Sequence, residues 1–187
     1  MINAIITDFD GTLVDTFEAN LRAYQKAFAE VGMVLTAEQY RQCFGYRFER
    51  FMLAVGVTDE KTCNHIKRAK SAFYPLFFEY LRPNKALLEL IGTFHQKGGK
   101  TAIASTARKE NLINVLNYLK IGKMFDLIFA GADVKQGKPS PDIYLKAMNL
   151  LGVQAEETLI FEDSDVGIEA AKASCANYLI VSPEQFK

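Results

Sequence analysis

Short, almost wholly apolar runs recur along the chain, and most of them are followed by a segment with helical periodicity. Runs of four or five residues of this kind are typical of strands that are buried on both faces, as in a parallel sheet. Five such strands are predicted, at residues 4–7, 100–104, 127–130, 158–161 and 178–181. Strands that alternate with helices predict an α/β fold in three layers, with a parallel sheet between two layers of helices.

One long stretch interrupts this alternation, because residues 16–80 carry helical signals almost throughout and no strong strand signal. Within it, Thr36 and Gln39 have the spacing of a capping box at the start of a short helix. Pro75 is expected to kink or split the last helix of the stretch, since proline lacks the amide hydrogen that a helix interior uses. The predicted domains are therefore a core α/β domain, residues 1–15 and 81–187, and an inserted helical cap domain, residues 16–80.

Two aspartates, Asp8 and Asp10, follow the first strand directly. Side chains at positions i and i+2 of a strand point to the same side, so both carboxylates are expected to face one small volume. Carboxylates that close repel each other unless they share a cation or a proton. Mg²⁺ prefers oxygen ligands of this kind and shares its site with substrate phosphate. Taken alone the motif is weak, because a solvated acidic turn has the same sequence pattern.

Polar residues with complementary chemistry follow the other strands. Ser105 and Thr106 follow the second predicted strand, Lys138 lies beyond the third, and Glu162 and Asp163 end the fourth. Because ligands of open α/β sheets bind outside the carboxyl ends of the strands, these groups are expected to converge. Acids for a cation, a hydroxyl and an ammonium together fit phosphoryl transfer through a carboxylate nucleophile.

Four sequence motifs, in order along the whole chain, resemble those of the haloacid dehalogenase-like hydrolase superfamily. They are D-F-D-G-T-L-V-D at 8–15, I-A-S-T at 103–106, G-K-P-S-P-D-I-Y at 137–144 and F-E-D-S-D-V-G-I-E-A-A at 161–171. The chain looks like the subgroup with a small helical cap, which includes sugar-phosphate phosphatases, phosphoglycolate phosphatase and β-phosphoglucomutase. The resemblance implies a Rossmann-like core. One departure is Asn84, which stands where a glycine often follows the proline.

By this resemblance, Asp8 is the nucleophile that becomes an aspartyl-phosphate, and Asp10 is the general acid and base. The implied cofactor is Mg²⁺. Its implied ligands are Asp8, Asp10 through its backbone carbonyl, Asp163 and Glu162. For Glu162, a structural role is an equally good interpretation of the sequence.

The resemblance also assigns phosphate contacts to Ser105 and Thr106, and it gives Lys138 the stabilisation of phosphoryl charge and the orientation of the nucleophile. Ser105 and Lys138 are thereby predicted as catalytic residues. From the residues alone, Ser105 could instead cap a helix, and Lys138 could be an ordinary surface lysine. Arg47 and Arg50 of the predicted cap are candidates for binding an anionic substrate, with a solvated loop as the alternative.

The predicted function is a Mg²⁺-dependent phosphatase that hydrolyses small phosphorylated metabolites, such as sugar phosphates. The alternatives are a phosphomutase of the β-phosphoglucomutase type, a haloacid dehalogenase and a non-catalytic phospho-acceptor domain. The segment 15–24 resembles the start of the β-phosphoglucomutase cap, where a histidine stands in place of Asn20. Asparagine does not titrate near neutral pH as histidine does, which favours the phosphatase over the mutase.

Composition excludes several classes of partner. The 22 basic and 22 acidic residues balance, which argues against a nucleic-acid groove or a polybasic membrane patch. No apolar run is long enough to span a bilayer. Three widely spaced cysteines argue against a disulfide framework and predict a reducing, cytoplasmic location. Neither the composition nor the motifs indicate an oligomeric state.

Overall fold

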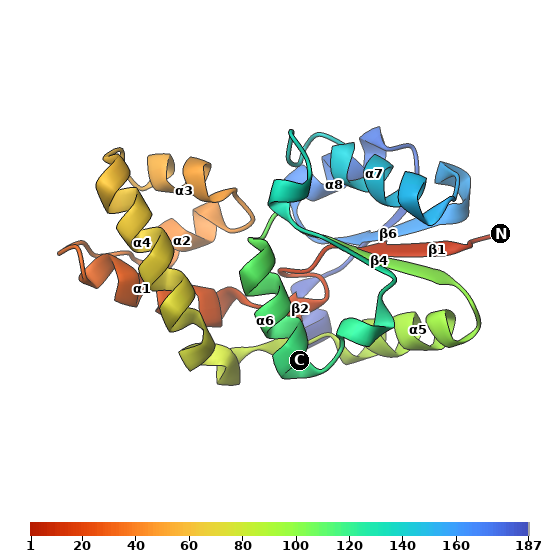
Figure 1. Cartoon of the computed structure of the whole chain (residues 1–187), viewed down its shortest axis with the longest axis horizontal. Helices are drawn as coiled ribbons and strands as arrows, with labels where there is room; N and C mark the ends of the chain where they lie inside the picture. Colours follow the sequence, from red (N-terminus) through yellow and green to blue (C-terminus); the bar gives the residue numbers. More distant parts are fainter. Residues whose placement is uncertain (187) are drawn as a thin grey trace. The chain divides into compact units, whose positions relative to one another are not determined.

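The computed structural model describes residues 1–186, and the chain divides into two compact units. One unit comprises Met1–Asp15 and Arg82–Lys187, of which Lys187 lies outside the described residues, and the other comprises Thr16–Leu81. Figure 1 shows the chain coloured along its sequence.

The first unit is built on a five-stranded parallel sheet with the order β5-β4-β1-β6-β7. Its strands are β1 (Ala4–Thr7), β4 (Lys100–Ala104), β5 (Leu127–Phe129), β6 (Thr158–Glu162) and β7 (Asn177–Ile180). Each predicted strand is present, and no bound differs from the predicted one by more than one residue. All four residues of β1 are buried, as expected of a central strand that is covered on both faces.

Helices cover both faces of this sheet, which makes the three layers that the sequence predicts (Figure 1). Buried side chains of α7 and α8 pack with Ala4, Ile6 and Ala102 on one face, while α5 and α6 lie on the other. The helices of this unit are α5 (Lys85–Gln96), α6 (Lys109–Leu119), α7 (Asp142–Leu151) and α8 (Asp165–Ala173). Short 3₁₀ turns are η2 (Gly122–Met124), η3 (Gly131–Asp133), η4 (Ala155–Glu157) and η5 (Pro183–Phe186).

The strand order makes β1 the point where the chain changes direction across the sheet. The chain passes from β1 to β4 and β5 on one side, and then returns past β1 to β6 and β7 on the other. In open α/β sheets such a switch point leaves a crevice at the carboxyl ends of the strands, where ligands bind. Residues that follow β1, β4 and β6 therefore lie close together at this edge of the sheet.

A small antiparallel ribbon was not predicted from the sequence. Strands β2 (Val14–Asp15) and β3 (Arg82–Pro83) pair where the chain leaves and re-enters the first unit. Two residues per strand are too few for a periodic signal. The ribbon leads into α5, whose N-cap Asn84 accepts from the Leu87 amide at 3.1 Å. The Asn84 amide also donates to the Thr12 carbonyl at 3.3 Å, so this departure from the family pattern connects α5 to the loop after β1.

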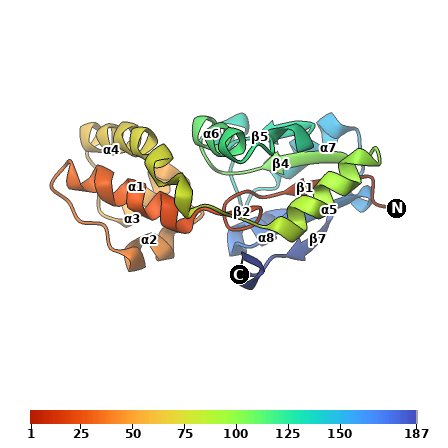
Figure 2. The same ribbon diagram turned by 90° about the horizontal axis from the view of Figure 1, so that it is seen from below.

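The second unit is helical throughout its ordered elements (Figure 2). They are α1 (Phe17–Ala29), α2 (Ala37–Cys43), α3 (Phe48–Ala54), α4 (Glu60–Phe73) and η1 (Tyr74–Tyr80). The capping box of Thr36 and Gln39 is present, and α4 ends just before Pro75, as predicted. Tyr24, Tyr40 and Phe51 pack in tilted and edge-to-face arrangements with ring centroids 4.9–5.5 Å apart, so aromatic residues help to form the interior of this unit.

Candidate active site

Asp8 lies directly after β1, at the carboxyl end of the central strand. Its amide donates to the Phe161 carbonyl of β6 at 2.9 Å, which extends the strand pairing by one residue and fixes the backbone. The residue is 7% exposed, so its carboxylate is largely removed from water. Burial first, and then the charges of Glu162 and Asp163, raise the pKa of Asp8 well above its usual range, against the opposing effect of Lys138.

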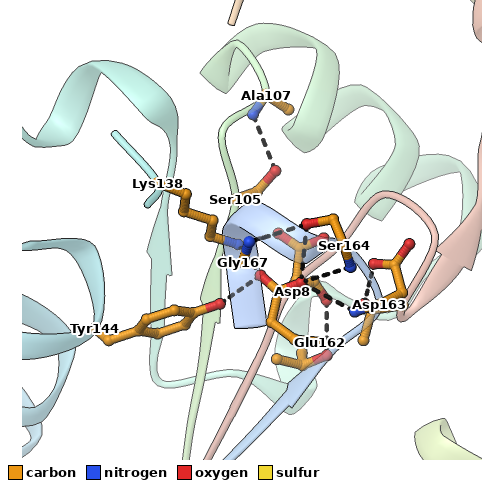
Figure 3. A network of polar contacts seen from close by, with 11 residues as sticks. Asp8, Ser105, Ala107, Lys138, Tyr144, Glu162, Asp163, Ser164 and Gly167 are labelled. Atoms are coloured by element: carbon orange, nitrogen blue, oxygen red, sulfur yellow. Dashed lines mark hydrogen bonds and ion pairs between the residues drawn. The ribbon is translucent and has the colours of Figure 1, made fainter. Parts of the chain in front are cut away.

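Lys138 comes from the loop between β5 and α7, and its side chain is only 2% exposed. Its ammonium donates to Asp8 Oδ1 and to Glu162 Oε1, both at 2.5 Å (Figure 3). Burial alone would lower the pKa of Lys138, but the carboxylate of Asp8 and the other groups around it hold that pKa well above its ordinary value. The interpretation of Lys138 as a surface lysine is therefore wrong.

Glu162 ends β6 and is completely buried. Five donors reach its carboxylate: Lys138 Nζ and Tyr144 Oη contact Oε1, while the Asp163 amide, the Ser164 amide and Ser164 Oγ contact Oε2. Burial alone would raise the pKa of Glu162, but Lys138 and the other donors keep it below its ordinary value. A Cβ at Gly167 would overlap this carboxylate, so the absence of a side chain there makes room for Glu162 beneath α8.

Asp163 completes a group of three carboxylates. Single oxygens of Asp8, Glu162 and Asp163 all lie within 4.8 Å of one another, which is a spacing that can hold a metal ion. Thr12 Oγ1 donates to Asp163 Oδ1 at 2.6 Å. Gly11 has a φ of +90°, and any Cβ there would overlap the Asp163 carboxylate, so glycine is needed both for the turn and for the close approach.

The three carboxylates can carry more negative charge than the Lys138 ammonium beside them balances. Burial first, and then the charges of the Glu162 and Asp10 carboxylates, raise the pKa of Asp163 to about 7. The pKa of about 7 means that Asp163 keeps its proton more readily than an ordinary aspartate, because its neighbours are also negative. A cation bound among the three carboxylates would balance that negative charge. The donor set, which consists of hard carboxylate oxygens with no sulfur or imidazole among them, suits a cation such as Mg²⁺.

The structure does not bring together every residue that the sequence nominates. Asp10 is partly exposed, and its backbone forms an isolated β-bridge with Val14. Its carboxylate is not one of the three in the acidic group. Ser105 follows β4, and because Ile103 pairs with Thr7, it lies at the same edge of the sheet as Asp8. Ser105 Oγ accepts from the Ala107 amide at 3.0 Å, and the N-cap of α6 is Arg108, so Ser105 does not cap that helix.

The remaining predicted residues lie in the loop next to Ser105 and in the helical unit. Thr106 follows Ser105 and is partly exposed. Arg47 is the N-cap residue of α3, and Arg50 lies within that helix with its guanidinium 3.8 Å from the centre of the Tyr46 ring. Both arginines belong to the second unit, and substrate binding by Arg47 and Arg50 stays a prediction.

Sequence reasoning missed three residues that shape the site: Thr12, Tyr144 and Gly167. All three lie within the motifs that carry the family resemblance. The sequence therefore gives their positions in those motifs, but it does not indicate which side chains they contact. Tyr144 has the spacing of an apolar residue of an amphipathic helix, and nothing in its sequence neighbourhood indicates that its hydroxyl reaches Glu162 at 2.6 Å.

The fold and the site together define a class: a parallel α/β enzyme with a buried aspartate, a lysine and an acidic group that can hold a metal at the switch point of its sheet. The chain belongs to the haloacid dehalogenase-like hydrolase family, whose pattern it matches over residues 5–181.

Relatives of known activity and structure support this placement. The chain is 32% identical over 177 residues to the phosphorylated carbohydrates phosphatase of Thermotoga maritima, covering 92% of this chain and 82% of that protein. It is similar to the structure of CbbY from Rhodobacter sphaeroides in complex with phosphate, at 30% identity and a TM-score of 0.85, over 96% of this chain and 86% of that one. It also resembles β-phosphoglucomutase from Clostridium difficile, at 25% identity and a TM-score of 0.82, over 97% and 85% of the two chains. Within residues 1–186, no helix combines the length and the apolar character that crossing a membrane requires.

Proposed function

We propose that this protein is a Mg²⁺-dependent phosphatase of small phosphorylated metabolites that works through an aspartyl-phosphate. The observation that carries the proposal is Asp8, buried at the carboxyl end of the central strand, with the Lys138 ammonium 2.5 Å from its carboxylate and two further acids beside it. A buried carboxylate held next to an ammonium is suited to attack phosphorus, because the cation attracts the phosphoryl oxygens to the nucleophile.

The proposed metal ligands are the carboxylates of Asp8 and Asp163 and the backbone carbonyl of Asp10. Mg²⁺ bound there would neutralise phosphoryl oxygens and the carboxylates around it. Glu162 stays a predicted ligand, but both of its oxygens already accept hydrogen bonds from the protein. In this proposal its principal role is to hold Lys138.

The protein's own residues account for two chemical steps. In the first, an Asp8 oxygen forms a bond to phosphorus while the ester oxygen leaves and takes a proton from Asp10. In the second, Asp10 accepts a proton from water, whose oxygen attacks phosphorus and breaks the bond to Asp8, releasing inorganic phosphate. Lys138, Ser105 and Thr106 contact the phosphoryl oxygens in both steps.

The helical unit is proposed to serve as a cap that excludes water and selects the substrate, with Arg47 and Arg50 as its anion-binding residues. Sugar phosphates are the proposed substrate class, since the Thermotoga maritima relative is a phosphatase of phosphorylated carbohydrates. A reducing, cytoplasmic location is proposed because Cys43, Cys63 and Cys175 are odd in number and widely spaced, which does not suit a disulfide framework.

A phosphomutase is the second candidate, and the similarity to β-phosphoglucomutase from Clostridium difficile is the observation in its favour. The dehalogenase alternative is weaker, because a halide leaving group needs neither an acid such as Asp10 nor Mg²⁺. A non-catalytic phospho-acceptor would be phosphorylated without turning over.

The decisive experiment is a screen of phosphorylated metabolites with Mg²⁺ that measures released phosphate over many turnovers. Repeated turnover by the wild-type chain, lost in Asp8→Asn and in excess chelator, is the expected result. Stoichiometric phosphorylation without turnover would support the phospho-acceptor instead, and full activity in chelator would refute the metal assignment.

A further inference from the structure

Tyr144 contacts the buried ion-pair network, although its position in the sequence indicates only packing. It lies in the first turn of α7, is fully buried, and donates its hydroxyl to Glu162 Oε1 at 2.6 Å. The same oxygen accepts from Lys138 Nζ at 2.5 Å. Figure 3 shows the tyrosine and the lysine approaching the glutamate from neighbouring positions.

The other half of the Glu162 carboxylate is fixed by local backbone. Its Oε2 accepts from the Asp163 and Ser164 amides at 3.0 and 3.3 Å, and from Ser164 Oγ at 3.3 Å. The carboxylate is thereby held in one orientation. Oε1 faces two donors that come from other elements, the lysine of the loop and the tyrosine of α7.

The Lys138 ammonium lies between two carboxylate oxygens, Oδ1 of Asp8 and Oε1 of Glu162, at equal distances of 2.5 Å. A hydroxyl that donates to Oε1 satisfies part of the acceptor capacity of that oxygen. Without it, the full negative charge of Glu162 Oε1 would attract the ammonium, at the expense of its bond to Asp8.

We propose that Tyr144 is a positioning residue that acts through Glu162 to hold Lys138 against Asp8. The inference rests on the proposed function, in which Lys138 stabilises the phosphoryl charge. The aromatic ring also contacts the ammonium, with its centre 5.1 Å from Lys138 Nζ. A phenylalanine keeps that ring, so Tyr144→Phe tests the hydroxyl alone.

The kinetic test compares Tyr144→Phe with the wild-type chain. Removing one hydrogen bond to a charged group in the network should lower kcat about tenfold, with KM changed less than about twofold because ground-state binding is retained. Tyr74→Phe is the matched control, since it removes a hydroxyl from a tyrosine that is 2% exposed in the helical unit. It should leave kcat unchanged.

A double-mutant cycle separates this role from packing. If the tyrosine acts through Glu162, then Tyr144→Phe should cost little further activity in a Glu162→Gln background. A fully additive loss, or wild-type kcat in Tyr144→Phe, would overturn the inference while leaving the phosphatase proposal intact.

A spectroscopic readout makes the inference independent of turnover. The ammonium resonance of Lys138 is identified by NMR as the lysine signal that disappears in Lys138→Met. It should shift in Tyr144→Phe and stay in place in Tyr74→Phe. An unchanged resonance in Tyr144→Phe would overturn the inference whatever the activity, whereas absence of any wild-type turnover would refute the proposed function alone.

Discussion

Replacing Asp163 with asparagine should make the metal-free protein more stable while abolishing its activity. The asparagine would keep the shape of the side chain and an oxygen for the hydroxyl of Thr12, which donates to Asp163 Oδ1 at 2.6 Å. It would remove one of the three clustered carboxylates. The predicted gain comes from relieving the cost of ionising a buried acid beside other acids.

The magnitude follows from the pKa of Asp163, which the fold raises from 3.8 to about 7. An acid whose pKa is raised on folding stabilises the folded state at low pH, and that stabilisation is lost as the pH rises through the folded-state pKa. Between pH 5 and a pKa of about 7 lie roughly two pH units, each worth about 1.4 kcal/mol. The advantage of Asp163→Asn should therefore grow by about 3 kcal/mol between pH 5 and pH 8, or about 6–12 °C in Tm.

The assay is denaturant unfolding of both proteins in excess chelator at pH 5 and at pH 8. The difference between the two proteins is the quantity to compare, because carboxylates remote from Asp163 contribute the same pH dependence to both. Asp8, whose pKa the Asp163 charge helps to raise, adds to the advantage of Asp163→Asn in the same direction. Asp165→Asn is the matched control, since Asp165 is an exposed acid two residues away at the start of α8. The difference in unfolding free energy between Asp165→Asn and the wild-type chain should change little between the two pH values.

Magnesium should reverse the order of stability of the wild-type chain and Asp163→Asn. Saturating Mg²⁺ should stabilise the wild-type chain at pH 8, because it binds the folded state and balances its acids, whereas Asp163→Asn should gain much less. An advantage of Asp163→Asn that is the same at pH 5 and pH 8 in chelator would refute the reasoning, since it would mean that Asp163 carries no raised pKa. Equal stabilisation of both proteins by Mg²⁺ would remove Asp163 from the metal site.

The remaining predictions concern chemistry and specificity. Asp8→Asn should lower turnover by about 10⁴-fold or more, as removal of a nucleophile does, and wild-type turnover in this variant would exclude the covalent mechanism. Arg47→Ala and Arg50→Ala should change KM and substrate preference more than they change phosphorylation of Asp8 by a small generic donor; equal effects on every substrate would exclude a role in selection. Because Asn20 replaces the histidine of the mutase cap, β-glucose 1-phosphate with a trace of glucose 1,6-bisphosphate should yield free phosphate, and rapid glucose 6-phosphate formation without phosphate release would establish the mutase.

Much of the fold was predictable because its signals are local. The apolar runs that form β1, β4 and β6 are short and bounded by polar residues, so burial on both faces can be recognised without knowing the partners of each strand. The capping box at Thr36 is predictable for the same reason, since both of its hydrogen bonds join residues three apart. The ribbon of β2 and β3 was not predictable, because its pairing joins residues far apart in the chain.

The sequence by itself determined which residues end the strands, and hence that acids, a hydroxyl and an ammonium are available at one edge of a parallel sheet. Only the tertiary structure decided how they meet. Lys138 reaches Asp8 across 130 positions of sequence, and the order of the strands, which no local pattern encodes, puts β1 between β4 and β6. The tyrosine hydroxyl at Glu162 shows the same limit: helical periodicity predicts that Tyr144 faces the interior, but the acceptor it meets there depends on long-range packing.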